Sequence, residues 1–342
     1  MLQLLSKIYG SVVNAKNKKY DSDSAEIVRC NVPVISVGNL TTGGTGKTPF
    51  VIFLANLLID AGIRPVIIGK GYRKKRSGYV LVSDGNYIVN DPDLAGDEML
   101  LIAKKVKAPV VAHESKSEAA LIAEKHFSPD VILIDDGFQH RKLHRDIDIL
   151  LIDSATLANQ NLLPAGRLRE PLSSATRADV IIEIGKIPYD EILRKYLINN
   201  QKIFKSEIVP EALIGLNENT INDEEIKIIK EKVIAVSGIA NPERFEISLL
   251  FNDYKVVKHI KFRDHKRYFQ YNIDAIIAEC KEKGIDKIIT TEKDSVKIRK
   301  FSSIFENNNV ECFVFPVKIE IVEKQDEFRD YIVSKIEGFK GQ

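Results

Sequence analysis

Cysteine is scarce in this sequence. Only Cys30, Cys280 and Cys312 occur among 342 residues. Their odd number and wide spacing match neither a zinc site nor a framework of disulfide bonds. We interpret all three as buried or incidental thiols of a protein that stays in a reducing compartment.

Long hydrophobic runs are also missing. Typical apolar runs are VILI at 131–134 and IDILLI at 147–152. Both fall far short of the roughly 20 apolar residues that a membrane-spanning helix needs. The sequence therefore predicts a protein that is cytosolic or sits on a membrane surface without crossing it.

The chain carries little net charge. Fifty basic and 48 acidic residues leave a formal charge of +2, so no global field favours nucleic acid as a partner, and an anionic ligand has to meet a local basic patch. The composition, with 44% hydrophobic residues, is that of a globular protein. The length suggests two domains, because a single core rarely grows past roughly 300 residues.

The first 20 residues, MLQLLSKIYGSVVNAKNKKY, have the pattern of a basic amphipathic helix. The apolar residues that fall roughly on one helical face are Leu2, Leu4, Leu5, Ile8, Val12 and Val13, and the positive charges are Lys7, Lys16, Lys18 and Lys19. Such a helix can lie in a membrane interface. An ordinary helix docked on the body of the protein has the same pattern, so the residues alone leave both interpretations open.

Short β-branched runs alternate with helical patterns through the rest of the chain. The first expected strands cover 32–38, 64–69, 130–135 and 146–153, and 49–62 has helical spacing. Strands that are apolar on both faces and alternate with helices predict an α/β fold with a parallel sheet covered on both sides.

A connection rich in proline, glycine and arginine, at 161–179, interrupts this alternation, which then resumes. We therefore expect a second, smaller α/β domain. The predicted division is an N-terminal helix at 1–20, a first α/β domain at 21–158, the second at 159–322, and a C-terminal helix at 323–342 that packs back on the body.

The segment TTGGTGKT at 41–48 matches the phosphate-loop pattern G-x-x-x-x-G-K-[ST] except at its first position, where Thr41 replaces glycine. An expected strand precedes it and an expected helix follows, so backbone N–H groups and the helix dipole can face a phosphate. Lys47 would reach the β- and γ-phosphates, and the Thr48 hydroxyl would bind Mg²⁺. The residues expected to bind nucleotide are Thr41, Thr42, Gly43, Gly44, Thr45, Gly46, Lys47 and Thr48. The alternative is a flexible glycine-rich turn.

Two absences narrow the class of nucleotide-binding protein. Partition ATPases carry a lysine where Thr42 stands. GTPases carry an N-K-x-D motif, and the nearest segment, TTEKD at 290–294, has its lysine at the wrong place. A phosphoryl-transfer enzyme that uses ATP is therefore favoured over a regulatory switch.

Acidic residues follow two apolar segments. Asp135 and Asp136 end an apolar strand, where either can hold Mg²⁺ or simply belong to a solvated turn. Asp97 and Glu98 begin a helix, a usual place for acids, but Asp97 can also act as general base for a substrate hydroxyl, with Glu98 next to the metal. His265 lies in the charged turn KFRDHKRY and by itself indicates a surface histidine.

Taken together and in order, VPVISVGNLTTGGTGKTP, GKGY, AGDE, LIDDGFQH, LLPAGRLREP and TTEKD resemble the tetraacyldisaccharide 4'-kinase family, from about residue 4 to about residue 330. That family phosphorylates the lipid A precursor disaccharide in Gram-negative bacteria. The resemblance implies a P-loop NTPase-like parallel sheet domain and a second α/β domain, with the active site in the cleft between them. It also implies ATP and Mg²⁺ as cofactors, the lipid A disaccharide precursor as substrate, and an N-terminal helix that binds the cytoplasmic face of the inner membrane.

The resemblance further implies roles for individual residues. Asp97 matches the catalytic base and His265 its partner from the second domain, while Lys47 stabilises the transferred phosphoryl group. The groups implied around the metal are Thr48, Glu98 and Asp136. Those implied near the substrate are Tyr72 and Arg169. Our own hypothesis is that Arg73, Arg167 or Arg169 pairs with the substrate's 1-phosphate, because guanidinium groups suit paired contacts to a phosphate.

The sequence departs from the family in places that remove none of these groups. Met99 replaces a common proline, and Lys116 stands near a position that is often arginine. Our hypothesis is an ATP-dependent kinase for the 4'-hydroxyl of tetraacyldisaccharide 1-phosphate. The alternatives are a membrane-recruited P-loop ATPase switch without a small-molecule acceptor, and a non-enzymatic α/β binding module.

Overall fold

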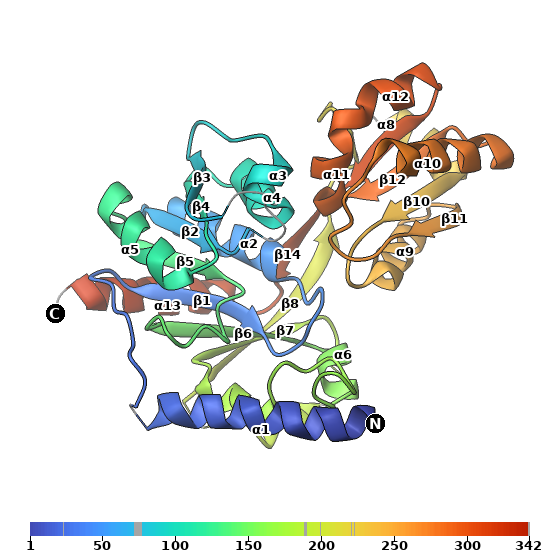
Figure 1. Cartoon of the computed structure of the whole chain (residues 1–342). Helices are drawn as coiled ribbons and strands as arrows, with labels where there is room; N and C mark the ends of the chain where they lie inside the picture. The colour runs from blue at the N-terminus through green and yellow to red at the C-terminus, as the bar shows by residue number, and fades with distance from the viewer. Residues whose placement is uncertain are drawn as a thin grey trace. The chain divides into compact units, whose positions relative to one another are not determined.

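The computed structural model describes residues 1–22, 24–71, 77–187, 190–198, 200–219, 221 and 223–340. The contacts within the chain define two units (Figure 1). Unit 1 consists of Met1–Ile208 and Ile319–Gln342, and unit 2 of Val209–Lys318. Each unit has its own sheet and its own hydrophobic core.

The described part of unit 1 contains a nine-stranded sheet in the order β14-β8-β7-β6-β1-β5-β2-β4-β3. The strands are β1 (Val34–Asn39), β2 (Pro65–Gly69), β3 (Val80–Asp84), β4 (Pro109–Ala112), β5 (Val131–Asp135), β6 (Ile147–Asp153), β7 (Val180–Ile184), β8 (Lys202–Pro210) and β14 (Val317–Ile321). The pairs from β8 to β4 are parallel, and β3 runs antiparallel to β4. Strands β1, β2, β5, β6 and β7 are buried along their whole length, as in sheets covered on both faces. The predicted α/β class with a mainly parallel sheet is confirmed.

Unit 1 also contains helices. They are α1 (Leu2–Asp21), α2 (Lys47–Asp60), α3 (Pro92–Ala95), α4 (Asp97–Lys105), α5 (Lys116–Phe127), α6 (Ser154–Ala158), α7 (Asp190–Arg194) and α13 (Gln325–Lys340), with a 3₁₀ turn η1 at Leu172–Arg177. Helix α2 contacts β1, β2 and β5, and α5 contacts β2, β4 and β5. The C-terminal helix α13 joins the same unit, because the ring of Phe328 packs against Phe50 and Phe204 with centroids 6.1 and 5.2 Å away.

Unit 2 is a smaller α/β body with the strand order β11-β10-β12-β13-β9. Its strands are β9 (Ile214–Gly215), β10 (Val233–Ser237), β11 (Val256–Lys261), β12 (Lys287–Thr291) and β13 (Glu311–Phe315). Its helices are α8 (Asp223–Glu231), α9 (Pro242–Phe251), α10 (Gln270–Lys283), α11 (Glu292–Ile298) and α12 (Ser302–Asn307), with a 3₁₀ turn η2 at Arg299–Phe301. Strand β9 is antiparallel to β13, and the other pairs are parallel.

The boundary between the units differs from the sequence-based expectation. Strands β7 and β8, which we assigned to a second domain at 159–322, extend the sheet of unit 1, where β7 pairs with β6. The proline- and arginine-rich connection at 161–179 is therefore no linker between domains. Its backbone is tied to the glycine-rich loop, because Arg169 N–H donates to Leu40 O at 2.7 Å and Thr42 N–H donates to Arg167 O at 2.8 Å.

Helix α1 presents a small, polar face to unit 1 and an apolar face outward. Ser6 is buried and donates to Leu162 O at 2.8 Å, and a Cβ on buried Gly10 would lie 2.8 Å from Leu162 Cδ1. Tyr9 donates to Arg169 O at 3.0 Å. The exposed apolar residues are Met1, Leu2, Leu4, Leu5, Ile8 and Val12. No helix among the residues that the structure describes is both long and apolar enough to cross a bilayer.

Candidate active site

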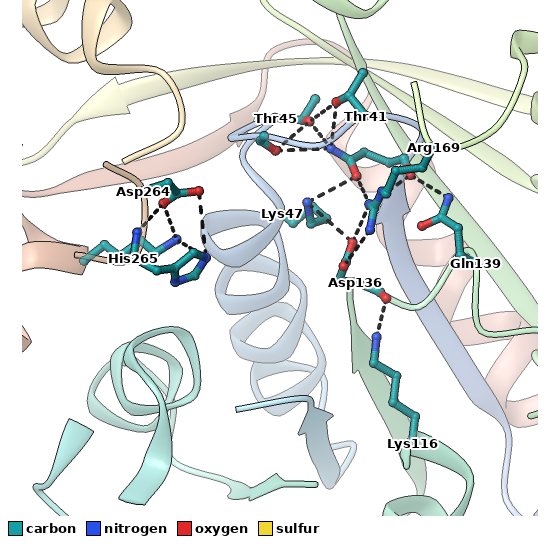
Figure 2. A network of polar contacts seen from close by, with 12 residues as sticks. Thr41, Thr45, Lys47, Lys116, Asp136, Gln139, Arg169, Asp264 and His265 are labelled. Carbon is teal, nitrogen blue, oxygen red and sulfur yellow. Dashed lines mark hydrogen bonds and ion pairs between the residues drawn. The ribbon is translucent and has the colours of Figure 1, made fainter. Parts of the chain in front are cut away.

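The glycine-rich loop joins β1 to α2, as its spacing predicts. Gly46 takes the left-handed conformation (φ +92°) and caps α2, and Gly43 also has a positive φ of +143°. Asn39, the last residue of β1, donates through Nδ2 to the Thr41 hydroxyl at 3.1 Å and to the Thr45 hydroxyl (Figure 2). This buried amide holds the loop over the start of α2, where a helix dipole favours an anion.

Lys47 is the first residue of α2 and points back across the loop. Its Nζ lies 3.2 Å from Asn39 Oδ1 and 3.5 Å from Asp136 Oδ1. Thr48 follows it in the first turn and is half-buried. An ammonium group at this place, next to free helix N–H groups, is arranged to meet a polyphosphate.

Asp136 sits at the centre of a charged network, directly after β5, with a left-handed backbone (φ +53°). Arg169 donates to both of its carboxylate oxygens, through Nη1 at 2.9 Å and Nη2 at 2.7 Å (Figure 2). Lys116 Nζ donates to the Asp136 backbone carbonyl. Burial raises the pKa of Asp136, but Lys47 and Arg169 outweigh it and hold the pKa well below its ordinary value. Asp136 is therefore ionised at neutral pH.

Asp135 has the opposite environment. It is 3% exposed, and its Oδ1 is buried without a hydrogen-bond partner in the described structure. Burial, then Glu98 and Asp136, raise the pKa of Asp135 to about 7. An orphaned carboxylate oxygen of this kind requires either a proton or a cation.

A metal site built from protein side chains alone is absent from the described residues, where no group of three or more His, Cys, Asp and Glu residues is placed to hold an ion. Mg²⁺ usually takes one or two carboxylates, together with phosphate oxygens and water. Asp135 and Asp136 supply carboxylates that fit that pattern. Glu98 is a neighbour of this acidic pair, and Thr48 belongs to the loop.

Asp97 opens α4 and is buried, with 4% of its surface exposed. Its Oδ1 accepts the Glu98 N–H at 3.1 Å, and Gly96 before it has φ +80°. Met99 occupies the position where the family often has proline, and it packs so closely on Gly69 that a Cβ there would lie 2.5 Å from the Met99 Cε. The helix start therefore holds Asp97 against the sheet.

His265 belongs to unit 2, in the turn between β11 and α10. Its backbone is left-handed (φ +55°), and its ring Nε2 lies 3.2 Å from Lys293 Nζ. It is half-buried rather than the surface histidine that the residues alone indicated, with 15% of its side chain exposed.

The arginines proposed near the substrate differ in their surroundings. Arg169 uses both terminal nitrogens on Asp136. Arg167 donates through Nε to Thr42 O at 3.2 Å and lies on the outer side of the loop, where Thr42 is exposed. Tyr72 and Arg73 lie outside the described residues.

Sequence reasoning missed three residues of this network. Asn39 organises the loop, Gln139 donates to Asn39 O at 2.9 Å, and Lys116 supports Asp136. Asn39 and Gln139 fall inside the quoted motifs, and Asn39 directly follows the strand expected at 32–38, where a side-chain amide can bond to the adjacent loop. Lys116, at the start of a distant helix, has no comparable signal.

A phosphate loop between a parallel strand and a helix, with an acid after the neighbouring strand, defines a P-loop NTPase-like α/β protein. The model of the family described as tetraacyldisaccharide-1-P 4'-kinase matches residues 1–337. The chain belongs to this family, so the resemblance inferred from its motifs is confirmed.

Individual relatives agree with this assignment. The tetraacyldisaccharide 4'-kinase of Halothermothrix orenii is 35% identical over 94% of this chain and 88% of its own length. That of Aquifex aeolicus is 37% identical over 93% of this chain and 94% of its own. A crystal structure of LpxK from Aquifex aeolicus in complex with ATP matches with a TM-score of 0.76 and 34% identity, covering 97% of each chain. The kinase fold therefore extends over both units.

Proposed function

We propose that the chain transfers the γ-phosphoryl group of ATP to the 4'-hydroxyl of the tetraacyldisaccharide 1-phosphate precursor of lipid A. The observation that carries the proposal is the convergence of Lys47, Asp136 and Arg169 on the phosphate loop in a chain of this family. Such a network is built for a polyanion and a divalent cation, because it supplies fixed positive charge beside an ionised carboxylate.

ATP would lie along residues 41–48, with its terminal phosphates between the loop N–H groups and Lys47. Mg²⁺ would be held by Thr48 and the acidic pair, with Glu98 close by. The unpartnered Asp135 Oδ1 is the observation that fits a cation here, and we therefore include Asp135 beside Asp136. When bound, the ion neutralises charge on the phosphate oxygens.

Asp97 is our candidate for the general base. Its burial and its place at a helix start favour a defined orientation, and its carboxylate can accept the proton of the 4'-hydroxyl as that oxygen attacks phosphorus. We propose His265, which unit 2 contributes, as a second catalytic residue.

The substrate's existing 1-phosphate calls for a guanidinium group. Arg167 and Arg73 are our candidates. Arg169 is already committed to Asp136 by two hydrogen bonds, so we assign it to keeping that acid in place rather than to direct substrate contact.

We propose that α1 binds the cytoplasmic face of the inner membrane, so that the protein is peripheral and takes its substrate from the lipid surface. The support is the orientation of the helix, which buries Ser6 and Gly10 while Leu4, Ile8 and Val12 are 65%, 55% and 64% exposed. An exposed apolar face flanked by lysines is the usual pattern of an interfacial helix.

The test uses the full chain, γ-labelled ATP, Mg²⁺ and detergent-dispersed tetraacyldisaccharide 1-phosphate. We expect label on the disaccharide, and none when its 4'-hydroxyl is blocked. Consumption of ATP with no labelled lipid would contradict the proposal, since that is the behaviour of an ATPase switch.

A further inference from the structure

The motif TTEKD, at 290–294, forms the end of β12 and the first turn of α11. Its lysine does not stand at the place that the guanine-reading N-K-x-D motif requires. Its charged residues Glu292, Lys293 and Asp294 belong to unit 2, the unit that carries His265. Their contacts show what the motif does there.

Asp294 is fully buried and acts as an anchor for the segment around His265. Its Oδ2 accepts the Gly238 N–H at 2.8 Å, and its Oδ1 accepts the Tyr268 hydroxyl at 3.1 Å. Lys297 Nζ lies 3.0 Å from the same Oδ1 and supplies the compensating charge. One carboxylate therefore ties the end of β10 to the start of α10.

This anchor reaches the backbone of His265 directly. The Gly238 carbonyl accepts the His265 N–H at 3.2 Å. Gly238 therefore bonds to Asp294 through its N–H and to His265 through its carbonyl. His265 has a left-handed φ of +55°. A non-glycine residue keeps that conformation only when its surroundings hold it there.

Lys293 acts on the imidazole ring. Its Nζ lies 3.2 Å from His265 Nε2 and 3.3 Å from Asp264 Oδ1. A lysine ammonium group has donors and no acceptor, so the Nε2 that it meets has to present a lone pair, and the ring proton belongs on Nδ1. Asp264 Oδ2 lies 3.8 Å from Nε2. This is too far for it to accept a hydrogen bond from Nε2 and so favour a proton on that nitrogen.

We propose that Lys293 is a positioning residue that holds His265 as the Nδ1–H tautomer, while Asp294 fixes the loop that carries it. Nδ1–H is then the donor that His265 offers to a carboxylate. The part of this inference that concerns catalysis rests on the proposed catalytic role of His265; the part that concerns the tautomer rests on unit 2 alone.

The tautomer is tested on the whole protein without nucleotide or lipid, by long-range ¹H–¹⁵N correlation spectra of ¹⁵N-histidine-labelled protein at mildly alkaline pH, with His265→Gln to assign the signals. We expect His265 to show a protonated Nδ1 and a bare Nε2. Lys293→Met should move it toward the Nε2–H form. A wild-type spectrum with Nε2 protonated, or a Lys293→Met spectrum identical to wild type, overturns the inference.

The kinetic consequence is measured on the same variant. Lys293→Met should lower kcat about 10- to 100-fold, the usual range when a supporting hydrogen bond to a working residue is lost, with the KM for ATP unchanged. Lys287→Met is the matched control, because Lys287 is also largely buried (18% against 19% exposed for Lys293) and pairs with Asp286 instead of a histidine. Its kcat and His265 signals should match wild type.

These readouts separate the two hypotheses. If the spectrum is as expected and His265→Gln is fully active, His265 has no part in the proposed mechanism. The tautomer assignment is then still correct. A spectrum as expected, with a slow His265→Gln but a fully active Lys293→Met, overturns the positioning role of Lys293 in the reaction.

Discussion

Arg169 and Asp136 form a two-point ion pair across 33 residues of sequence. The pair joins the connection after β6 to the turn after β5, and Lys47 completes it from the phosphate loop at 3.5 Å. A carboxylate held between two cations keeps its charge in a half-buried place, because each cation favours the ionised form. The glycine-rich loop and the turn after β5 are thus linked by charge within unit 1.

Removing Lys47 tests the centre of the proposed site. Lys47→Ala should reduce kcat/KM for phosphoryl transfer by about 10²–10³-fold or more, since it removes a preorganised cation from the transferred group. Lys125→Ala, on the exposed surface of α5, is the control and should keep wild-type rates in the labelled-ATP assay. Near-normal transfer by Lys47→Ala would place the phosphates elsewhere.

Removing Arg169 should affect stability as well as activity. Arg169→Met leaves Asp136 with fewer partners, so we expect a loss of about 2 kcal/mol, typical of hydrogen bonds to a charged group, in urea-induced unfolding. Arg64 makes a similar two-point pair with Asp130 but is 71% exposed, and Arg64→Met should cost much less stability, because exposed ion pairs are screened by solvent. Equal losses in the two variants would mean that the Arg169 pair is no stronger than a surface pair.

The proposed role of Asp97 as general base predicts that its loss affects kcat and leaves ATP binding intact. Asp97→Asn should lower kcat by about 10²–10⁴-fold while ATP affinity, measured by isothermal titration calorimetry, stays close to wild type. Asp60→Asn, at the exposed end of α2, controls for the loss of one negative charge. A variant with normal kcat would require another base.

The proposed membrane role of α1 predicts that its exposed apolar side chains are needed for vesicle binding and not for folding. Replacing Leu4, Leu5, Ile8 and Val12 together by glutamine should weaken binding to anionic vesicles at least about tenfold, because each apolar side chain buried in lipid contributes up to roughly 2 kcal/mol. Circular dichroism should show an unchanged fold.

The matched control for α1 removes exposed apolar surface from unit 2. Ile247, Leu250 and Phe251 of α9 are 50%, 53% and 85% exposed, and their replacement by glutamine should leave vesicle flotation unchanged. If both sets weaken flotation equally, α1 has no special part in membrane binding.

His140 predicts a specific acid sensitivity. Burial first, then Lys116 and Arg145, lower the pKa of His140 to about 4. Between about pH 6.5 and about pH 4, His140 is therefore protonated in the unfolded chain and neutral in the native protein. Because the unfolded state binds more protons, the free energy of unfolding falls as the pH falls through this window.

His140→Gln should remove that loss. The variant should be less stable than wild type at neutral pH, because His140 Nε2 lies 3.2 Å from the Ser117 hydroxyl, and the gap in Tm should narrow as the pH falls. His126→Gln, on the exposed side of α5, is the control. A gap that stays constant across the pH range would show that His140 is not the group responsible.

Local sequence was sufficient for much of the fold and of the loop. Buried strands such as β1 and β5 can be predicted because β-branched and other apolar residues fill most of their positions. The glycines at 43 and 46 mark the positive φ values that the loop requires. The order of the motifs was sufficient for the family. The domain boundary was not predictable, because β7 and β8 have the same apolar pattern whether they extend one sheet or begin another.

What the sequence determined by itself is the chemistry of short segments: where a strand ends in an acid, where a loop can expose its N–H groups, which family shares these motifs. Only the tertiary structure decided which of two adjacent acids is paired. Asp136 meets Arg169 and Lys47 while Asp135 keeps an unpartnered oxygen. That difference depends on the left-handed backbone of Asp136 and on cations from distant segments. Contacts between charges that are far apart in the sequence leave no periodic pattern in it, so they could not be predicted.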